Sequence, residues 1–320
     1  MKQLDTRVAG LLGPATFHFW KTLALMLGLL GRAAPAVQAQ APAWEAALPV
    51  ALPAAPYQTL ATVATAEVVY IAGTFSQTVS FGSTTLTTTG PNTFVAKWSK
   101  ATRRYAWAVA TNVGSGNELQ VRGLAAGPGG VYLAGGFRGT NVPLGSTILQ
   151  PASGTTQGGF VAKLTEAGGT AGFTWVQALT STGGISVDAL TLAGSTLYLG
   201  GTAQGSSSFG PLPVAAGNMG MVYVARLQDA GTGATFAWVH RLTDSGFAII
   251  TALQSTSGGL YVGGEFRSPA ILIGTTTLVN AGGTISAAYG DDVFVAKLLD
   301  NGSAATVGWA RQLGGPDYDH

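Results

Sequence analysis

A chain of 320 residues, 47% of them hydrophobic, is long enough to bury a large core. It has no cysteine, which excludes disulfide bonds and cysteine-ligated metal sites. Only 9% of its residues are charged, and 16 Lys and Arg nearly balance 14 Asp and Glu. No clustered basic footprint is present, so we expect no nucleic-acid partner.

Residues 1–39 have the pattern of a secretory signal peptide. Basic residues precede an apolar stretch of ten, Thr22–Gly31, and small residues predict cleavage after Ala39. An uncleaved anchor is the alternative, but a bilayer span needs about 20 apolar residues. We therefore expect a secreted or cell-surface protein with no transmembrane segment in the mature chain. Without residues 1–39, 12 basic residues remain against 13 acids, so the basic character belongs to the signal.

Tryptophan marks a repeat in the rest of the chain. Five of the seven tryptophans are 63, 68, 63 and 71 residues apart. They are Trp44, Trp107, Trp175, Trp238 and Trp309. Such spacing predicts an N-terminal strand and linker at 40–56 and a repeat array at 57–313. Its units run over about 57–111, 112–179, 180–242 and 243–313, and residues 314–320 begin a further, truncated unit.

Three more landmarks recur in one order in each unit. The first is a tyrosine in an apolar run that ends in glycine: Tyr70 and Gly73, Tyr132 and Gly135, Tyr198 and Gly201, Tyr261 and Gly264. The second is an apolar residue followed by glycine: Phe81-Gly82, Leu144-Gly145, Phe209-Gly210 and Ile273-Gly274. The third is an aromatic-Val-Ala segment that ends in a cation: Lys97, Lys163, Arg226 and Lys297.

Each unit is expected to form four principal strands. The apolar runs are short, rich in Val, Leu and aromatic residues, and bounded by Gly, Ser, Thr and Asn. In the third unit the predicted strands are Val187–Ala193, Thr196–Thr202, Val222–Leu227 and Ala237–Leu242. Gly129-Gly130 and Gly258-Gly259 are expected to connect first and second strands, because glycine readily adopts positive φ. The apolar-Gly landmark is expected to add a short edge piece.

Repeated four-stranded antiparallel units predict an all-β fold, a β-propeller whose blades are apolar on both faces because neighbours enclose them. A parallel β-helix and a row of small sandwiches are the alternatives. The coils of a β-helix are far shorter than these units, and a sandwich needs about 100 residues. Four full repeats are visible, so the ring is either incomplete, with the chain a fragment lacking further blades and a sorting domain, or closed by the Trp44 strand.

The Val-Tyr-x-x-Gly, Phe-Val-Ala-Lys-Leu and Trp landmarks resemble those of a bacterial secreted β-propeller repeat family. The resemblance covers residues from about 57 to 313, and it implies export, often as type IX secretion cargo. In that family an acidic residue commonly stands just before the Phe-Val-Ala-Lys segment. Here it is present only as Asp292, and its counterparts are assigned to Thr93, Gly159 and Val222. A role that depends on a ring of these acids is therefore not expected.

The recurring residues have structural and functional interpretations. The tryptophans could form a sugar-binding platform, but packing between blades is the favoured reading. The recurring cations could form a positive ring for an anion. The favoured interpretation is a stem along apolar surface, with its head in water over a neighbouring aromatic ring.

No catalytic, metal-binding or cofactor-binding residue is predicted. His240 is the one histidine inside a unit and has no recurring partner. Glu118, Asp188, Asp244 and Glu265 lie near strand ends, where a hydrolase would need two carboxylates close together. Asp291-Asp292 and Asp317-x-Asp319 lack the pattern of a calcium loop. The Asn301-Gly302-Ser303 sequon fits a turn.

The function expected from the sequence is a non-enzymatic binding or scaffold module for an unknown protein or carbohydrate. An extracellular carbohydrate-active hydrolase or lyase, with a carboxylate pair at the propeller mouth, is one alternative. An architectural spacer of a surface protein is another.

Overall fold

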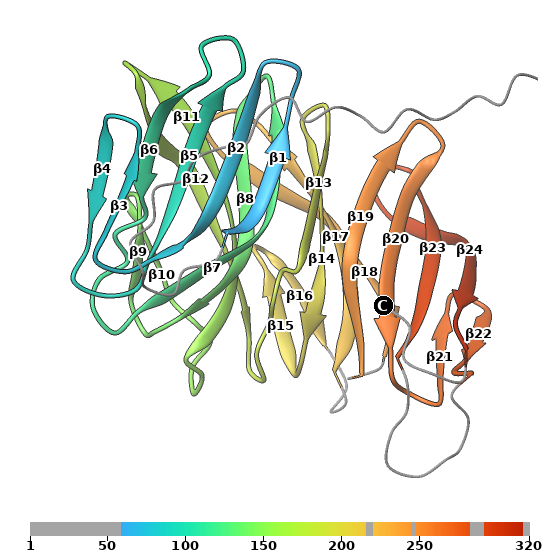
Figure 1. Ribbon diagram of the computed structural model, residues 1–320. Helices are drawn as coiled ribbons and strands as arrows, with labels where there is room; N and C mark the ends of the chain where they lie inside the picture. The colour runs from blue at the N-terminus through green and yellow to red at the C-terminus, as the bar shows by residue number, and fades with distance from the viewer. Residues whose placement is uncertain (1–58, 216–219, 245–246, 282–290, 316–320) are drawn as a thin grey trace, which may run out of the picture. The chain divides into compact units, whose positions relative to one another are not determined.

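The computed structural model describes residues 59–215, 220–244, 247–281 and 291–315. These residues belong to one compact unit, Val50–His320. The expected signal segment 1–39, the segment 40–56 with Trp44, and Asp317 and Asp319 lie outside them. The described part is all-β, as predicted, and contains no helix, hence none that could cross a membrane (Figure 1).

Four antiparallel sheets follow one another along the chain, each with four principal strands in sequence order (Figure 1). Sheet 1 comprises β1 (Thr59–Ala64), β2 (Val68–Phe75), β5 (Asn92–Ser99) and β6 (Arg104–Ala110). Sheet 2 comprises β7 (Glu118–Gly127), β8 (Gly130–Arg138), β11 (Gln157–Ala167) and β12 (Thr170–Ser181). Sheet 3 comprises β13 (Ala189–Ala193), β14 (Thr196–Ala203), β17 (Met221–Asp229) and β18 (Ala234–Thr243). Sheet 4 comprises β19 (Ala248–Thr256), β20 (Gly259–Phe266), β23 (Asp292–Asp300) and β24 (Ala305–Leu313).

A short hairpin separates the second and third principal strands of each unit, where the apolar-Gly landmark predicts an edge piece. The hairpins are β3 (Thr78–Phe81) with β4 (Thr84–Thr87), β9 (Val142–Leu144) with β10 (Thr147–Leu149), β15 (Ser206–Phe209) with β16 (Leu212–Ala215), and β21 (Ala270–Ile273) with β22 (Thr276–Val279). The landmark glycine begins each turn at a φ near +60°, which glycine adopts without steric cost. One hairpin links two units: β15 of the third unit pairs with β12, the fourth principal strand of sheet 2.

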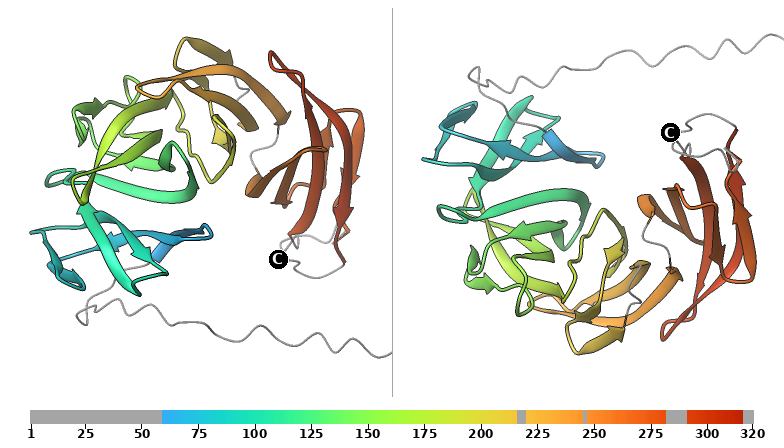
Figure 2. Two further views of the ribbon diagram at one scale, coloured as in Figure 1. Left: turned by 90° about the horizontal axis from the view of Figure 1, so that it is seen from above. Right: turned by 90° about the horizontal axis from the view of Figure 1, so that it is seen from below.

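The strands of each sheet lie side by side with the usual twist (Figure 2). Their apolar side chains form cores between consecutive sheets. One core joins Trp107 of sheet 1 to Phe160 of sheet 2, a second joins Trp175 to Tyr223, and a third joins Trp238 to Phe294. A smaller core lies between sheet 1 and its own hairpin. Trp107, Trp175 and Trp238 are thus packed where one unit meets the next.

The landmark glycines lie where the first strand of a unit approaches the second. A Cβ on Gly135 would lie 1.8 Å from the carbonyl oxygen of Gln120, and one on Gly264 would lie 2.1 Å from that of Ile249. The first strand is bulged beside both glycines, between Val121 and Gly123 and between Ile250 and Ala252. Glycine recurs here because the bulge leaves no room for a side chain.

The register corrects one counterpart assignment made from the sequence. Asp292 pairs with Phe266, and the residues in the equivalent ladder position are Asn92, Gly158 and Met221. Thr93, Gly159 and Val222 are instead equivalent to Val293. Asp292 lies two residues before Phe294, whereas Thr93, Gly159 and Val222 lie directly before the aromatic residue of their own strands. Asp292 itself is fully buried and accepts hydrogen bonds from the Ala281 amide and Gln312.

Replacing Gly135 by alanine is predicted to lower the free energy of unfolding by about 2–3 kcal/mol, because the new methyl group meets backbone. Gly172→Ala is the matched control, since Gly172 also lies in a strand and has nothing within 4 Å of its Cβ position. The control is expected to change stability by less than about 0.5 kcal/mol. Urea unfolding of the two variants measures the difference, and equal midpoints would contradict the account of the bulge.

Candidate functional site

Strand pairing brings the tyrosine, the cation and the tryptophan of each unit into one row. Lys97 lies opposite Tyr70 on one side and Trp107 on the other, and the other three units repeat this register. The remaining rows are Tyr132-Lys163-Trp175, Tyr198-Arg226-Trp238 and Tyr261-Lys297-Trp309. The lysine ammonium groups lie 5.5–5.9 Å from the centroids of the tyrosine rings, within the range of cation–π attraction.

In sheet 2 the row binds a carboxylate from sheet 3. One oxygen of Asp229 accepts from the Tyr132 hydroxyl and the Lys163 ammonium group, both at 2.7 Å. The other oxygen accepts from the Trp175 indole at 2.9 Å and from the Gly231 amide at 3.0 Å. Lys163 is only 4% exposed. The buried charges therefore satisfy one another across the boundary between two units.

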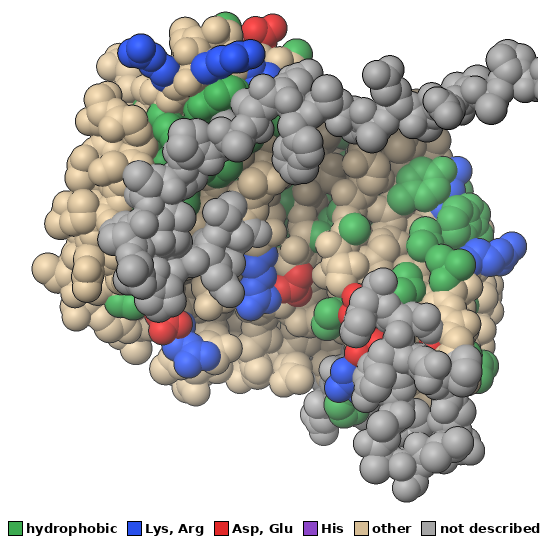
Figure 3. Space-filling model, in the orientation of Figure 1, with side chains coloured by type: hydrophobic (Ala, Val, Ile, Leu, Met, Phe, Trp, Pro, Cys, Tyr) green, Lys and Arg blue, Asp and Glu red, His purple; other side chains and the backbone are tan. Residues whose placement is uncertain are grey.

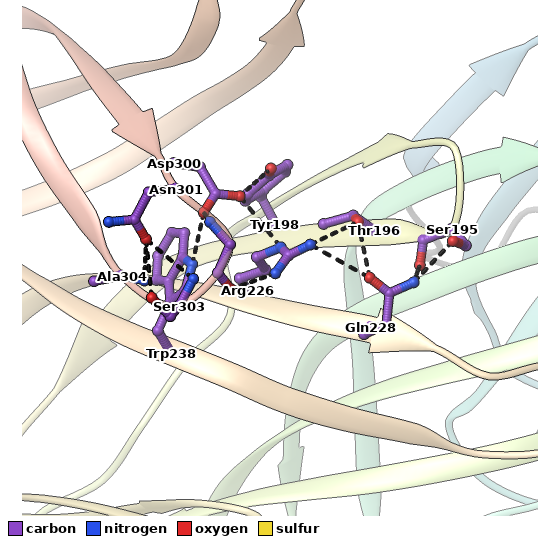
Figure 4. A network of polar contacts seen from close by, with 11 residues as sticks. Ser195, Thr196, Tyr198, Arg226, Gln228, Trp238, Asp300, Asn301, Ser303 and Ala304 are labelled. Carbon is purple, nitrogen blue, oxygen red and sulfur yellow. Dashed lines mark hydrogen bonds and ion pairs between the residues drawn. The ribbon is translucent and has the colours of Figure 1, made fainter.

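The row of sheet 3 binds Asp300 of sheet 4 in the same way (Figure 4). Asp300 accepts from the Tyr198 hydroxyl at 2.7 Å and from the Trp238 indole at 3.0 Å, and Arg226 Nε lies 3.2 Å from it. Burial and the hydrogen bond to Asp300 raise the pKa of Tyr198 to about 12. Arg226 also donates to the carbonyl of Gly302.

The row of sheet 1 binds Glu166 of sheet 2. Its carboxylate accepts from Lys97 and, at 2.8 Å, from the Trp107 indole. The Glu166 side chain is 44% exposed, so this pair is the most solvated of the three. We call each set of tyrosine, cation, tryptophan and carboxylate an interface cluster. Clusters 1, 2 and 3 are centred on Glu166, Asp229 and Asp300.

The three carboxylates were not singled out by the sequence analysis, although a signal for them exists. Each lies three residues after the cation of its own unit, at the end of the third strand. In the first unit the same position holds Lys100. Asp229 and Asp300 also accept the amide two residues later, which closes the following turn. Acidic residues are common at turns, so their position alone does not indicate that these three also bind the row of the preceding unit.

The expectation that the cation heads lie in water is wrong for Lys163, which is buried and ion-paired. The expected position over a neighbouring aromatic ring is confirmed for the three lysines, which lie over tyrosine rings. The cations of the first three units do not form an open positive ring either, because each is paired with a carboxylate. These residues are engaged in holding units together.

The row of sheet 4 differs from the other three. Tyr261, Lys297 and Trp309 lie in register, but within the described residues no ion pair joins Lys297 to a carboxylate. The central strands of sheets 2 and 3 are buried on both faces, whereas β20 and β23 alternate between buried and partly exposed residues. The expectation that every blade is enclosed on both faces is therefore wrong for sheet 4.

We call this surface the open face of sheet 4. It consists of Ile249, Tyr261, Val293, Val295, Lys297, Leu299, Trp309 and Leu313, and the same register places the charged residues Glu265 and Arg311 on this side of the sheet. Figure 3 shows hydrophobic side chains gathered over β20, β23 and β24 on a surface that otherwise carries mostly uncharged polar and backbone atoms. Sheet 4 thus combines exposed apolar side chains with charged ones, among them the Lys297 ammonium group.

A polar groove crosses sheets 2 and 3 and consists of two adjoining pockets of about 110 and 250 Å³. Gln157, Ile185 and Ser186 line both pockets. Glu118, Gln120 and Arg122 lie at one end, and Thr202 and Gln204 at the other. Arg138 also lines the first pocket, and the apolar Met221 of sheet 3 and Ile249 of sheet 4 line the second. The lining therefore mixes amides, hydroxyls and backbone groups with charged and apolar side chains.

The carboxylates considered from the sequence are dispersed. Asp188 is bound by Arg122 and by the Ser186 hydroxyl beside the groove, and Glu118 lines the groove itself. Asp244 is paired with Arg241 on the surface, and Glu265 lies on β20.

The remaining candidates are not brought together into one site. Asp291 binds Arg267 through two hydrogen bonds. Burial lowers the pKa of His240, and no group of three metal-ligating side chains occurs among the described residues. Asn301 accepts the amides of Ser303 and Ala304, so the sequon forms a turn.

Asp229→Asn is predicted to lower the free energy of unfolding by about 3 kcal/mol, because it leaves the buried Lys163 without a counter-charge. Glu166→Gln is expected to cost about 1 kcal/mol or less, since solvent screens that pair. Asp244→Asn is the surface control. Denaturant unfolding would contradict the account if the Asp229 and Asp244 variants were equally stable.

Acid is predicted to destabilise the array through the interface clusters. Burial acts to raise the pKa of Asp229, but hydrogen bonds from Lys163, Tyr132, Gly231 and Trp175 outweigh it and lower the pKa. The pKa values of Glu166 and Asp300 are lowered in the same way. A depressed pKa gives stability that is present above the unfolded value of about 4 and lost as the pH falls through the folded pKa.

The free energy of unfolding should thus stay level from about pH 7 to pH 5 and fall below about pH 4. Asp229→Asn should reduce the slope of that fall. An unchanged slope in urea titrations at a series of pH values would count against the assignment.

The chain matches no protein-family model, and a search of curated proteins gives no match. The roles of the interface clusters, the open face and the groove are therefore inferred from contacts, burial and charge.

Proposed function

We propose that the chain is an exported, non-enzymatic scaffold that binds another protein, with its four sheets as blades of a β-propeller. The repeated four-stranded antiparallel units and the cores between consecutive sheets support the propeller. The signal pattern at 1–39 supports export.

The observation that carries the binding role is the open face of sheet 4. Ile249, Leu299, Trp309 and Leu313 are among the most exposed large hydrophobic residues described, and they share one side of one sheet. Exposed apolar side chains gathered on one face are typical of protein-binding sites. Here Glu265 and Arg311 lie among them. An exposed tryptophan such as Trp309 is also a common centre of binding energy in such interfaces.

A non-enzymatic role is supported by how the recurring polar residues are used. The cations and indoles of three units are engaged with carboxylates between sheets, where they stabilise the array. Of the carboxylates considered for a hydrolase, Glu118 lines the groove and Asp188 lies beside it, but both oxygens of Asp188 are already bound by Arg122 and Ser186. A spacer role is less well supported, because a spacer has no need of the apolar face.

The polar groove supports a second candidate, the binding of an uncharged polar ligand such as a carbohydrate. Gln157 lies at the junction of the two pockets, and amide side chains can donate and accept hydrogen bonds. Binding on a glycan array that is lost in Gln157→Ala would support this candidate.

Protein binding is tested with the mature chain on an array of extracellular proteins. The double variant Trp309→Lys/Leu313→Lys is predicted to weaken the selected complex at least about tenfold, because two anchors are removed from the patch. Ile148→Lys is the control, since Ile148 is equally exposed on the distant β10. Equal affinities of the double variant and the wild type would contradict the proposal.

A further inference from the structure

Within the row of tyrosine, cation and tryptophan, the tryptophan is buried in the first three units and partly exposed in the fourth. Trp107, Trp175 and Trp238 are 4%, 6% and 5% exposed, whereas Trp309 is 36% exposed. In the last three units the contrast is larger four residues after the indole: Leu179 and Leu242 are 0% and 2% exposed, but Leu313 is 60% exposed. The residue type does not explain the difference, because each exposed residue of sheet 4 has a buried residue of the same type in the second unit. The following unit does, since it covers the first three rows.

The covered rows define what fits the uncovered one. Each is capped by an acidic residue of the next unit, which accepts hydrogen bonds from the cation or its tyrosine and from the indole. Beside it, the hairpin of the next unit can pair with the end of the fourth strand, as Phe209 of β15 pairs with Leu179. Tyr261, Lys297 and Trp309 present the same donors in the same register.

We infer that the open face of sheet 4 is the docking surface for a further unit of this repeat, one that carries Asp or Glu three residues after its third-strand cation. This inference deepens the proposed scaffold role by naming the chemistry of the partner. Three established interfaces supply the geometry, and the ammonium group of Lys297 supplies the charge complementarity.

The first sheet of a second copy does not meet this requirement. The position equivalent to Asp229 is Lys100. The Lys100 backbone amide donates to the carbonyl oxygen of Glu67, just as the Asp229 amide donates to that of Ser195. The Lys100 ammonium group donates to the carbonyl of Thr65 at 2.8 Å. Stacking that sheet on sheet 4 would place one ammonium group against another, which is repulsive.

The test adds the missing unit to the full chain. A copy of residues 180–243, which contains the counterpart of Asp229, is fused after Leu313 in place of residues 314–320. Because the chain has no cysteine, Leu313→Cys provides a single thiol on the open face, and its rate of maleimide labelling reports exposure. Fusion is expected to slow labelling at least about tenfold, because the thiol then reacts only after local opening.

Two controls make the result specific. Ile148→Cys, in a separate variant, should label at the same rate with and without the fusion. In the second control the copied Asp229 is replaced by lysine, as in the first unit, and protection of the thiol should be lost. Hydrogen exchange of the copied strands shows whether the added unit is folded.

The inference is overturned if the thiol stays reactive after fusion. This holds even if the added unit is unfolded, because the same residues fold when they lie against the Lys163 and Trp175 row of sheet 2. It is also overturned if the lysine variant protects equally well, or if the unfused chain shows concentration-dependent protection, which assigns the face to a second copy. The scaffold role stands apart from these outcomes, since its own test is partner binding by the unfused chain.

Discussion

The carboxylate that each unit offers to the unit before it is the interaction on which the array depends. A buried ammonium or guanidinium group is tolerated only with a counter-charge, and an indole N–H and a phenol hydroxyl need acceptors when they are buried. One carboxylate meets these needs in clusters 2 and 3, because its two oxygens accept up to four hydrogen bonds. The apolar cores alone would pack sheets without fixing which edges align.

This arrangement also gives the array a direction. Every cluster takes its tyrosine, cation and tryptophan from one unit and its acid from the next, so units one to four stack in a single order. At the first unit the acid is replaced by Lys100, and at the fourth no described acid is paired with the donors. The end units therefore differ in chemistry from the middle ones, although their backbones are alike.

The sequence predicted much of the fold because its landmarks are tied to backbone geometry. The third unit's expected strands all occur, with bounds within a few residues, since apolar runs and glycine turns are local signals. Gly135 and Gly264 were found by position, but their reason, a bulged neighbouring strand, required strand pairing. The acids at Glu166, Asp229 and Asp300 were missed because their partners lie more than 50 residues away, beyond any local pattern.

The central claim is that the cation and the following unit's carboxylate act together across the boundary. A double-mutant cycle with Lys163→Met and Asp229→Asn, followed by denaturant unfolding, measures their coupling directly. The account predicts a coupling free energy of about 2 kcal/mol, because the double variant no longer leaves one buried charge alone. Additivity within about 0.3 kcal/mol would show that the two side chains act independently, and it would contradict the account.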